Sequence, residues 1–483
     1  MRALQFLSWP RHGTAIAVAA LAAALGASAA RGVAQETSRG GSALTRVLTH
    51  DTLANGLEVI TLENHTVPLA TIEIAVRNGA FTQSPTEQGY AHLFEHLLFR
   101  SYGRRAPESF ASAAARLDAA YNGSTSEETV SYYLILPSAN LARGVHLLAR
   151  LIREPSFVAD DLERERAIVL GEIERHEADP VQQLNREVSQ RLWGDAWGRK
   201  DVAGNAEALA AATPKLLEAT YRRYYVPNNA ALIVGGDVTP AQVMALAARE
   251  LGDWRRAPDP FEANPIPQMP FLEAHRGVVF SSSQAANVTV ILAWQGPSVD
   301  VDTQATYAAD VLSDVLDRPT STFQHDLVDS GIFQSISIGY QTLRRTGPIT
   351  IFGITSREKL RGALTALFTE LSRLGDSTYI TDEELEDAKK AREVNNALAL
   401  EHTSATVQGL AFWWSVAGLD YYRTYVDRMR EQTRHDLAMY AKRYIIGRPM
   451  SVGVLTTPEG TEEARQILRY VLGGGTATAG SAQ

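Results

Sequence analysis

The sequence predicts an α+β fold made of two homologous halves. Strand-like segments alternate with longer amphipathic helical segments, a proline-rich segment divides the chain near its middle, and a similar order of segments follows it. The chain has 483 residues, 45% hydrophobic and 21% charged, which suits a large buried core. Its formal net charge is −9 and no basic stretch would follow a phosphate backbone, so nucleic acid is not an expected partner.

The first 34 residues are typical of an export signal and a lead-in. Two arginines precede a short alanine-rich apolar run over 14–30, and small residues offer cleavage after Ala29 or Ala34. The run is short for a membrane span, so we expect no stable membrane anchor and a periplasmic or, alternatively, secreted protein. The chain has no cysteine, which excludes disulfides, thiolate metal ligands and a lipoprotein anchor.

The first half is expected over 45–254 and begins with strands. The segments 47–53 and 57–62 predict the arms of a β-hairpin, because Asn55-Gly56 between them is a strong turn signal. The segment 70–76 alternates in hydrophobicity as a further strand.

A helix is expected with Ser84 as its N-cap and Pro85 in its first position, and it can run through His92 and His96 until Gly103. Glu87 lies three residues after Ser84, as in a capping box. The pattern after it predicts helices over 107–120, 140–153, 158–177, 181–193, 213–224 and 240–250, a turn at Asn122-Gly123, and strands over 129–136 and 230–235.

The segment 255–276 contains five prolines and is the expected linker. After it, 277–472 is expected to form a homologous domain without metal ligands, and 473–483 a disordered tail. A strand over 288–294 is followed by Tyr307-Ala308-Ala309-Asp310, which falls where Tyr90-Ala91-His92 falls in the first half. This similarity indicates an internal duplication.

Five consecutive residues carry the strongest chemical signal, His92-Leu93-Phe94-Glu95-His96. Their H-x-x-E-H spacing places two imidazoles one helical turn apart on the same face, with Glu95 beside them. Two neutral imidazoles and a carboxylate suit a catalytic Zn²⁺ ion, and both this order and H-E-x-x-H occur in zinc proteases. One inward histidine is usually structural, but a pair with its glutamate favours a metal site.

A two-histidine site needs at least one more protein ligand. On the predicted helix over 158–177, Glu165 and Glu172 lie two turns apart on the face of Ile168 and Val169, which is expected to be buried. A carboxylate on an apolar face needs a partner, which favours Glu172 as the third zinc ligand. Glu165 is expected to take part in catalysis, either by orienting His96 or His92 or by helping the residue that activates water, with a salt bridge to a basic residue as the alternative.

Glu95 would then not bind the metal. We expect it to accept a proton from the attacking water and to pass it to the leaving amine. The remaining glutamates of the predicted helix are expected on a solvated face, namely Glu163, Glu174 and Glu177.

On these residues the sequence resembles the insulinase and pitrilysin-type zinc peptidases, a family that includes mitochondrial processing peptidase and bacterial relatives. Three segments carry the resemblance: 89–99 with the H-x-x-E-H motif, 122–133, and 165–173 with the expected third ligand. The resemblance extends over nearly the whole chain after the export signal. It implies that each half is an α/β sandwich, a mixed, largely antiparallel sheet covered by helices.

The resemblance also implies the parts of an active site. His92, His96 and Glu172 would hold one Zn²⁺ ion per chain, and Glu95 would be the catalytic base. In such enzymes the peptide adds as an extra strand to a sheet edge near the metal. The segment at that position is Asn122, Gly123, Ser124 and Thr125, and Asn122 falls at the place of a substrate-contacting asparagine.

One departure from the family concerns the second half. Active relatives have an arginine and a tyrosine in a segment like R-E-x-x-G-x-x-Y, where they help to hold the substrate and the oxyanion. Aligned on Gly331, these positions fall at Leu327 and Gln334. The departure suggests a homologous partner subunit that supplies the Arg/Tyr pair in a heterodimer, with a homodimer as the alternative.

The expected function is therefore a zinc metallopeptidase that acts on oligopeptides or unfolded segments. One alternative is a non-catalytic subunit that binds peptides in a peptidase complex. The intact set of His92, Glu95, His96 and Glu172 disfavours this alternative, whereas the missing Arg/Tyr pair favours it. A zinc hydrolase of non-peptide amides is a third possibility, which only the resemblance disfavours.

Overall fold

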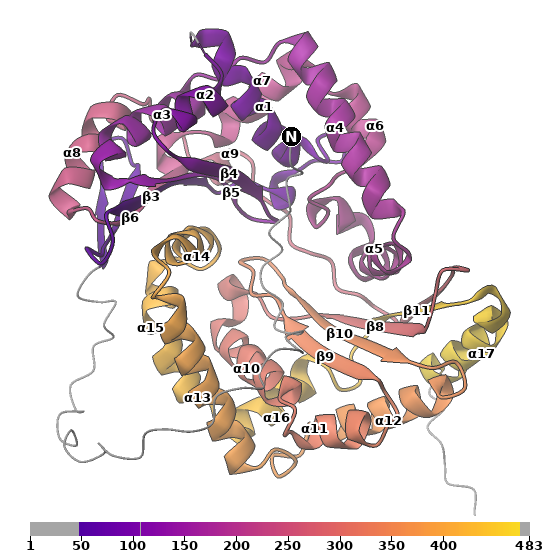
Figure 1. The fold of residues 1–483 in the computed structure, drawn as a ribbon. Coiled ribbons are helices and arrows are strands. Elements are labelled where there is room, and N and C mark those ends of the chain that lie inside the picture. Colours follow the sequence, from indigo (N-terminus) through magenta and orange to yellow (C-terminus); the bar gives the residue numbers. More distant parts are fainter. Residues whose placement is uncertain (1–47, 107, 474–483) are drawn as a thin grey trace, which may run out of the picture. The chain divides into compact units, whose positions relative to one another are not determined.

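Two mixed β-sheets, one in each half of the chain, organise the fold (Figure 1). The computed structural model describes residues 48–106 and 108–473. The predicted export signal and lead-in over 1–34 and the predicted tail beyond 473 lie outside these residues. Within the described ranges, no helix is long and apolar enough to cross a membrane.

The first sheet has the strand order β1-β2-β6-β3-β5-β4, which makes β4 an edge strand. The predicted hairpin forms around the Asn55-Gly56 turn, with Leu48 opposite Leu62. The strands are β1 (Leu48–Thr52), β2 (Glu58–Glu63), β3 (Leu69–Val76), β4 (Ala120–Thr125), β5 (Val130–Pro137) and β6 (Ala230–Gly236).

The second sheet has the order β7-β11-β8-β10-β9 and repeats the order β2-β6-β3-β5-β4 of the first. In both sheets the first of these pairs is parallel and the others are antiparallel. This shared topology confirms the duplicated α+β fold that the sequence predicts. The strands are β7 (Arg276–Ser281), β8 (Val288–Gln295), β9 (Ser335–Tyr340), β10 (Pro348–Thr355) and β11 (Ser451–Thr456).

Helices of its own half cover one face of each sheet. The helices of the first half are α1 (Tyr90–Arg105), α2 (Phe110–Ala115), α3 (Leu141–Arg153), α4 (Ala159–Glu177), α5 (Pro180–Trp193), α6 (Ala206–Ala211), α7 (Pro214–Tyr224), α8 (Pro240–Leu251) and α9 (Pro260–Ala263). Those of the second half are α10 (Val299–Asp317), α11 (Thr322–Gln324), α12 (Leu360–Arg373), α13 (Asp382–Ala399), α14 (Thr403–Val416), α15 (Leu419–Arg430), α16 (Arg434–Tyr444) and α17 (Thr461–Leu472). Among them, α5 and α14 do not belong to the cover of their own half's sheet.

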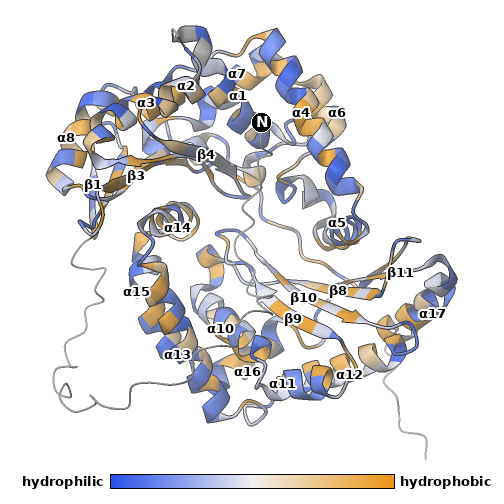
Figure 2. Ribbon diagram, viewed as in Figure 1, coloured by the Kyte–Doolittle hydropathy of each residue, from blue (hydrophilic) through white to orange (hydrophobic). Residues whose placement is uncertain are grey.

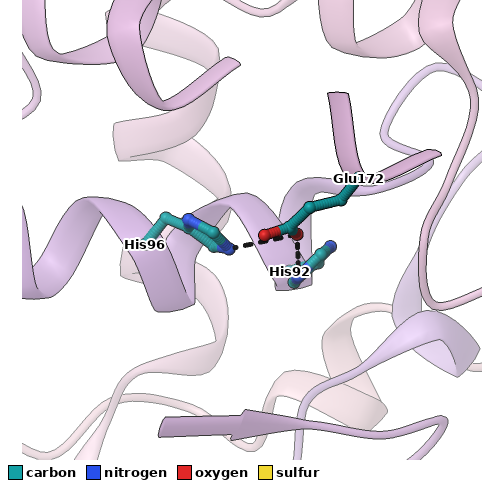
Figure 3. A group of neighbouring side chains, drawn as sticks. All are labelled: His92, His96 and Glu172. Atoms are coloured by element: carbon teal, nitrogen blue, oxygen red, sulfur yellow. Dashed lines mark ion pairs between the residues drawn. The ribbon is translucent and has the colours of Figure 1, made fainter. Parts of the chain in front are cut away.

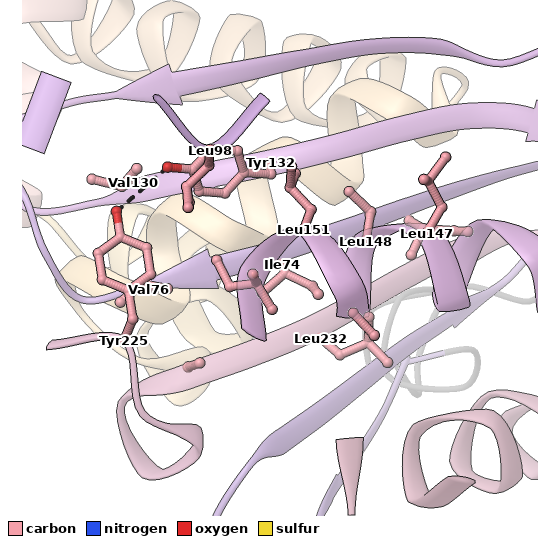
Figure 4. Packing of buried hydrophobic residues seen from close by; sticks show 14 of the residues in the cluster. Ile74, Val76, Leu98, Val130, Tyr132, Leu147, Leu148, Leu151, Tyr225 and Leu232 are labelled. Carbon is pink, nitrogen blue, oxygen red and sulfur yellow. Dashed lines mark hydrogen bonds between the residues drawn. The ribbon is translucent and has the colours of Figure 1, made fainter. Parts of the chain in front are cut away.

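The core of the first half lies between its sheet and these helices. Figure 4 shows leucines of α3, among them Leu148 and Leu151, packed near Ile74 of β3 and Leu232 of β6. All four side chains are buried. Burial of this much apolar surface is the main source of stability for the scaffold that carries α1.

The opposite face of each sheet is covered by a helix from the other half. Helix α14 packs Trp414 against the first sheet, and α5 packs Leu184 against the second. A Cβ atom added at Gly235 of β6 would lie 2.5 Å from Val407 of α14, so glycine permits the close approach there. Because each half completes the other's core, the described residues form one compact unit.

The edge strand β9 of the second sheet and its neighbour β10 alternate in burial along their length. Every second residue of β9 and β10 is buried, and Figure 2 shows hydrophobic and hydrophilic residues alternating there. Strand β3, in the middle of the first sheet, is buried on both faces. The alternation follows from one face of β9 and β10 being packed on helices and the other being open.

The predicted start of the motif helix is wrong by five residues, since Pro85 is the predicted first helical residue. Helix α1 begins at Tyr90, after Gly89 at φ 91°. Glu87 does accept a hydrogen bond from the N–H of Ser84 at 3.3 Å, as in a capping box, but within a turn. Gln83 accepts the N–H of Gly89 at 2.6 Å, and a left-handed glycine ends this turn before the helix can begin.

The predicted turn at Asn122-Gly123 is also wrong. Both residues lie inside β4, opposite Tyr133 and Tyr132 of β5. The helix predicted over 107–120 is only α2, and the chain reverses at Asp118, which has φ 51°. Pairing with a buried strand has overridden the local turn preference of Asn-Gly.

The proline-rich segment 255–276 lies between the last strand of the first sheet and the first strand of the second. It contains the short helix α9. Because α5 and α14 each pack on the sheet of the other half, the division into domains at this segment stays a prediction.

Candidate metal centre

Helix α1 has an apolar face and a polar face. Leu93, Leu97 and Leu98 are fully buried in the first core. The helical period places His92 and His96 on another face, toward α4. The leucines therefore hold α1 against the core of the first half, and the two histidines on the other face lie next to residues of α4.

Glu172 of α4 lies between the two histidines, as Figure 3 shows. Its Oε2 atom is 3.6 Å from Nε2 of His92 and 3.7 Å from Nε2 of His96. One ligand atom from each of the three residues lies within 4.8 Å of the others. The three residues predicted as zinc ligands are therefore brought together from two helices.

The three side chains fit a zinc ion. Tetrahedral bonds of about 2.0–2.2 Å place neighbouring ligand atoms about 3.3–3.6 Å apart, close to the separations seen here. The same separations are too long for hydrogen bonds, and Oε2 of Glu172 is buried without a hydrogen-bond partner. A cation among these atoms would satisfy that oxygen.

Burial affects the ionisation of the two histidines differently. It lowers the pKa of His92 to about 3, with smaller contributions from His96 and His176. It also opposes the charged form of His96, but the carboxylates of Glu165, Glu172 and Glu95 raise the pKa of His96 above its ordinary value. His92 is thus neutral at physiological pH, as a metal ligand must be.

Glu165 lies beside His96, where it could orient the ring as the sequence suggests. Its Oε2 atom is 3.4 Å from Nδ1 of His96, on the opposite side of the ring from Nε2. A carboxylate in this position fixes the orientation of a ligating imidazole. Val169 on the same helix is buried as expected, but Ile168 is 46% exposed, so the buried face of α4 is narrower than the sequence suggested.

Glu95 faces the edge strand rather than the three ligands. Its Oε2 atom accepts a hydrogen bond of 2.8 Å from Oγ1 of Thr125, the last residue of β4. Burial raises the pKa of Glu95, although the Thr125 hydroxyl and His96 act in the opposite direction. A raised pKa makes this carboxylate a better proton acceptor near neutral pH.

Strand β4 presents its residues alternately to two sides. A Cβ atom at Gly123 would lie 2.7 Å from Cγ of Glu95, so this glycine lets the strand approach the helix. Gly123 and Thr125 therefore face α1. Asn122 and Ser124 point to the opposite side, and Asn122 lies opposite Tyr133 of β5 in the strand pairing. The four residues predicted to bind substrate thus lie together on one edge strand.

Leu327 and Gln334, the residues aligned with the Arg/Tyr pair of the family, differ from that pair in chemistry and environment. Leu327 is fully buried in the core of the second half. Gln334 donates a hydrogen bond of 3.1 Å to Asn287 on the surface. Neither residue supplies the cation or the phenol of the family motif.

Comparisons with known proteins bear on both halves. Residues 58–204 match the family model described as Insulinase (Peptidase family M16), and residues 211–392 match the one described as Peptidase M16 inactive domain. An uncharacterized zinc protease of Mycobacterium leprae is 31% identical over 201 residues, 42% of this chain and 45% of that protein. One of Rickettsia felis is 22% identical over 351 residues, 72% of this chain and 83% of that protein.

Solved structures share the fold. A protease from Helicobacter pylori has a TM-score of 0.75 at 22% identity, covering 85% of this chain and 99% of its own. The periplasmic protease PqqL from Escherichia coli has a TM-score of 0.70 at 17% identity, covering 92% of this chain and 52% of its own. The fold agrees with the two family models, which follow one another along residues 58–392: the chain belongs to the insulinase family, peptidase family M16.

Proposed function

We propose that this protein is a zinc metallopeptidase that hydrolyses peptide bonds of oligopeptides or unfolded segments. The position of Glu95 carries the proposal. It lies on α1 between His92 and His96, two of the three potential zinc ligands, and it is hydrogen-bonded to Thr125 of the edge strand β4. A proton acceptor between a metal site and a peptide-binding edge is the arrangement that peptide hydrolysis needs.

His92, His96 and Glu172 would hold the ion, one per chain, which when bound acts as a Lewis acid toward water and a peptide carbonyl. Glu95 accepts the proton of the attacking water on Oε1, because Thr125 occupies Oε2. It then carries this proton to the nitrogen of the leaving amine. Glu165 holds the ring of His96 in place throughout.

The substrate would lie along β4 as a further strand. The strand is at the end of the sheet order, so its outer N–H and C=O groups are available to a peptide. An extended peptide paired there would pass beside Glu95 at the level of Gly123 and Thr125. Only unfolded or short chains present such an unpaired backbone, which favours oligopeptides over folded proteins.

We also propose that the protein works in the periplasm with a homologous partner that carries the Arg/Tyr pair. A chain purified from a periplasmic extract should begin at Ala30 or Gln35 and contain one zinc ion. With a co-expressed homologue that has the R-E-x-x-G-x-x-Y segment, cleavage of a fluorogenic peptide should exceed that of the chain alone by about 10²-fold, the usual worth of an oxyanion contact.

Two other outcomes would decide against parts of this proposal. Full activity of the chain as a homodimer would remove the need for a heterodimer. Bound zinc without cleavage, alone or with the partner, would instead support a peptide-binding, non-catalytic subunit. That second candidate is favoured by Leu327 and Gln334 at the positions of the Arg/Tyr pair.

Replacing Glu165 by Gln should weaken zinc binding by about 10–100-fold, because the amide orients His96 less strongly than a carboxylate does. The rate with saturating zinc should stay near that of the wild type. Competition with a chromogenic chelator measures the affinity. Glu163→Gln, an exposed change on the same helix, is the control, and equal affinities for both variants would refute this role.

A further inference from the structure

The tip of the hairpin β4–β5 determines where the edge strand lies. Ser126 and Thr129 close the tip, with the N–H of Ser126 donating to the carbonyl of Thr129 at 2.8 Å. Thr125, which precedes it, holds Glu95. A shift of the tip would therefore move both the strand and the hydrogen bond to Glu95.

Glu128 at this tip is bound by the second half of the chain. Its Oε2 atom accepts the backbone N–H of Arg344 at 2.8 Å, and its Oε1 atom accepts that of Arg345 at 3.0 Å. Its carbonyl oxygen accepts a hydrogen bond of 2.6 Å from Ser415 of α14. Glu128 is only 2% exposed, so three hydrogen bonds from the second half meet one buried residue of the first.

A second pair strengthens this contact. Lys200 donates to Oε2 of Glu127 at 2.8 Å and to the carbonyl of Thr346 in the second half. Its ammonium group also lies 4.5 Å from the ring centre of Trp193. From the first half, Phe81 donates its N–H to the carbonyl of Glu127 at 2.9 Å. The tip is thus held between a loop of the first half and the 344–346 segment of the second.

The hydrogen bonds to Glu128 fix the hairpin tip against the second half of the chain. Charged hydrogen bonds to two successive backbone N–H groups fix a carboxylate in both position and direction. A buried carboxylate that lost these donors would be left without compensation for its desolvation. The tip of the hairpin therefore stays where the loop of the second half places it.

We infer that Glu128 is a positioning residue through which the second half fixes strand β4, and with it Thr125 and Glu95, for the peptide. This inference rests on the proposed function. It gives the half without metal ligands a part in the reaction, because that half sets the edge on which the substrate would pair.

The test is a Glu128→Gln variant of the full chain, assayed with its partner if one is needed. The glutamine side chain has the same size, but its NH₂ group takes the place of one carboxylate oxygen. Because NH₂ cannot accept a hydrogen bond, one of the two bonds from the backbone N–H groups of Arg344 and Arg345 is lost. We expect KM to rise by about 10-fold, since pairing along β4 acts on bound peptide and transition state alike, with zinc content unchanged. Amide hydrogen exchange over 120–126 should become faster.

Thr403→Val is the matched control. Oγ1 of Thr403 accepts a hydrogen bond of 3.1 Å from Asn64, which also joins the two halves but lies away from the hairpin. It should leave KM and the exchange over 120–126 as in the wild type. Ser415→Ala removes one of the three hydrogen bonds to Glu128. It should raise KM and speed amide exchange over 120–126, as Glu128→Gln does but by less, and it provides the test if Glu128→Gln does not fold.

An unchanged KM with unchanged exchange over 120–126 in both variants would overturn the inference. A fall in kcat alone, at constant KM, would mean only a smaller folded fraction and would also contradict it. The exchange measurement does not depend on catalysis. If the wild type cleaved no peptide, the proposed function would fail while faster exchange in Glu128→Gln would still support the positioning role.

Discussion

Replacement of Glu95 by Gln is expected to lower kcat for peptide cleavage by about 10³-fold, within the range that general acid–base groups contribute. The amide cannot accept a proton from water, yet it has the same size and can still accept the hydrogen bond from Thr125. Because Glu95 is not one of the three grouped ligands, zinc content should stay at that of the wild type. Peptide cleavage and metal analysis of one preparation measure both.

Glu63→Gln is a suitable control for this variant. Glu63 is a partly exposed carboxylate at the end of β2 that pairs with His65, on the far side of the sheet order from β4. The Glu63→Gln protein should cleave the peptide at the wild-type rate. A Glu95→Gln protein that holds zinc and cleaves as fast as the wild type would show that another group moves the proton, and the proposed mechanism would be wrong.

The parts of the site on helices follow from the sequence. Spacing of three and four residues on α1 places His92, Glu95 and His96 close together in any α-helix. Glu172 was predicted because a carboxylate on an apolar helical face needs a partner, and in the structure it lies on the buried side of α4 beside both histidines. Helical periodicity depends only on residues close together in the sequence, so it can be recognised without knowledge of the tertiary fold.

The strand that faces Glu95 could not be predicted from the residues alone. Asn122-Gly123 is a strong local turn signal, and only pairing with β5, far less exposed than β4, places it within a strand. The hydrogen bond from Thr125 to Glu95 depends on that pairing and leaves no pattern in the sequence. The same holds for Glu128, whose partners Arg344 and Arg345 lie more than two hundred residues further along the chain.

The sequence also does not show that one helix of each half packs on the sheet of the other half. Helix α5 belongs to the first half by order but covers the second sheet, and α14 does the reverse. Amphipathic periodicity indicates that a helix buries one face, but not which sheet it meets. Glycines at the contact, such as Gly235 against Val407, are explained only once the helix is in place.

Replacement of Glu172 by Ala is expected to abolish both tight zinc binding and cleavage. It removes one of three grouped ligands and the only negative charge among them. The loss of affinity should exceed the roughly 10²-fold that changes around a metal ligand cause. Zinc at about 100 times its Kd stabilises a protein by about 2.7 kcal/mol, so thermal unfolding of the wild type should shift upward with zinc and that of the variant should not.

Glu174→Ala separates loss of the metal from damage to the helix. Glu174 lies on α4 two residues beyond Glu172, is exposed, and loses the same side-chain atoms when changed to alanine. Its zinc-dependent stabilisation and its activity should match those of the wild type. Because the unfolding shift reports binding without catalysis, a Glu172→Ala protein still stabilised by zinc would refute the assignment of the third ligand, whatever its activity.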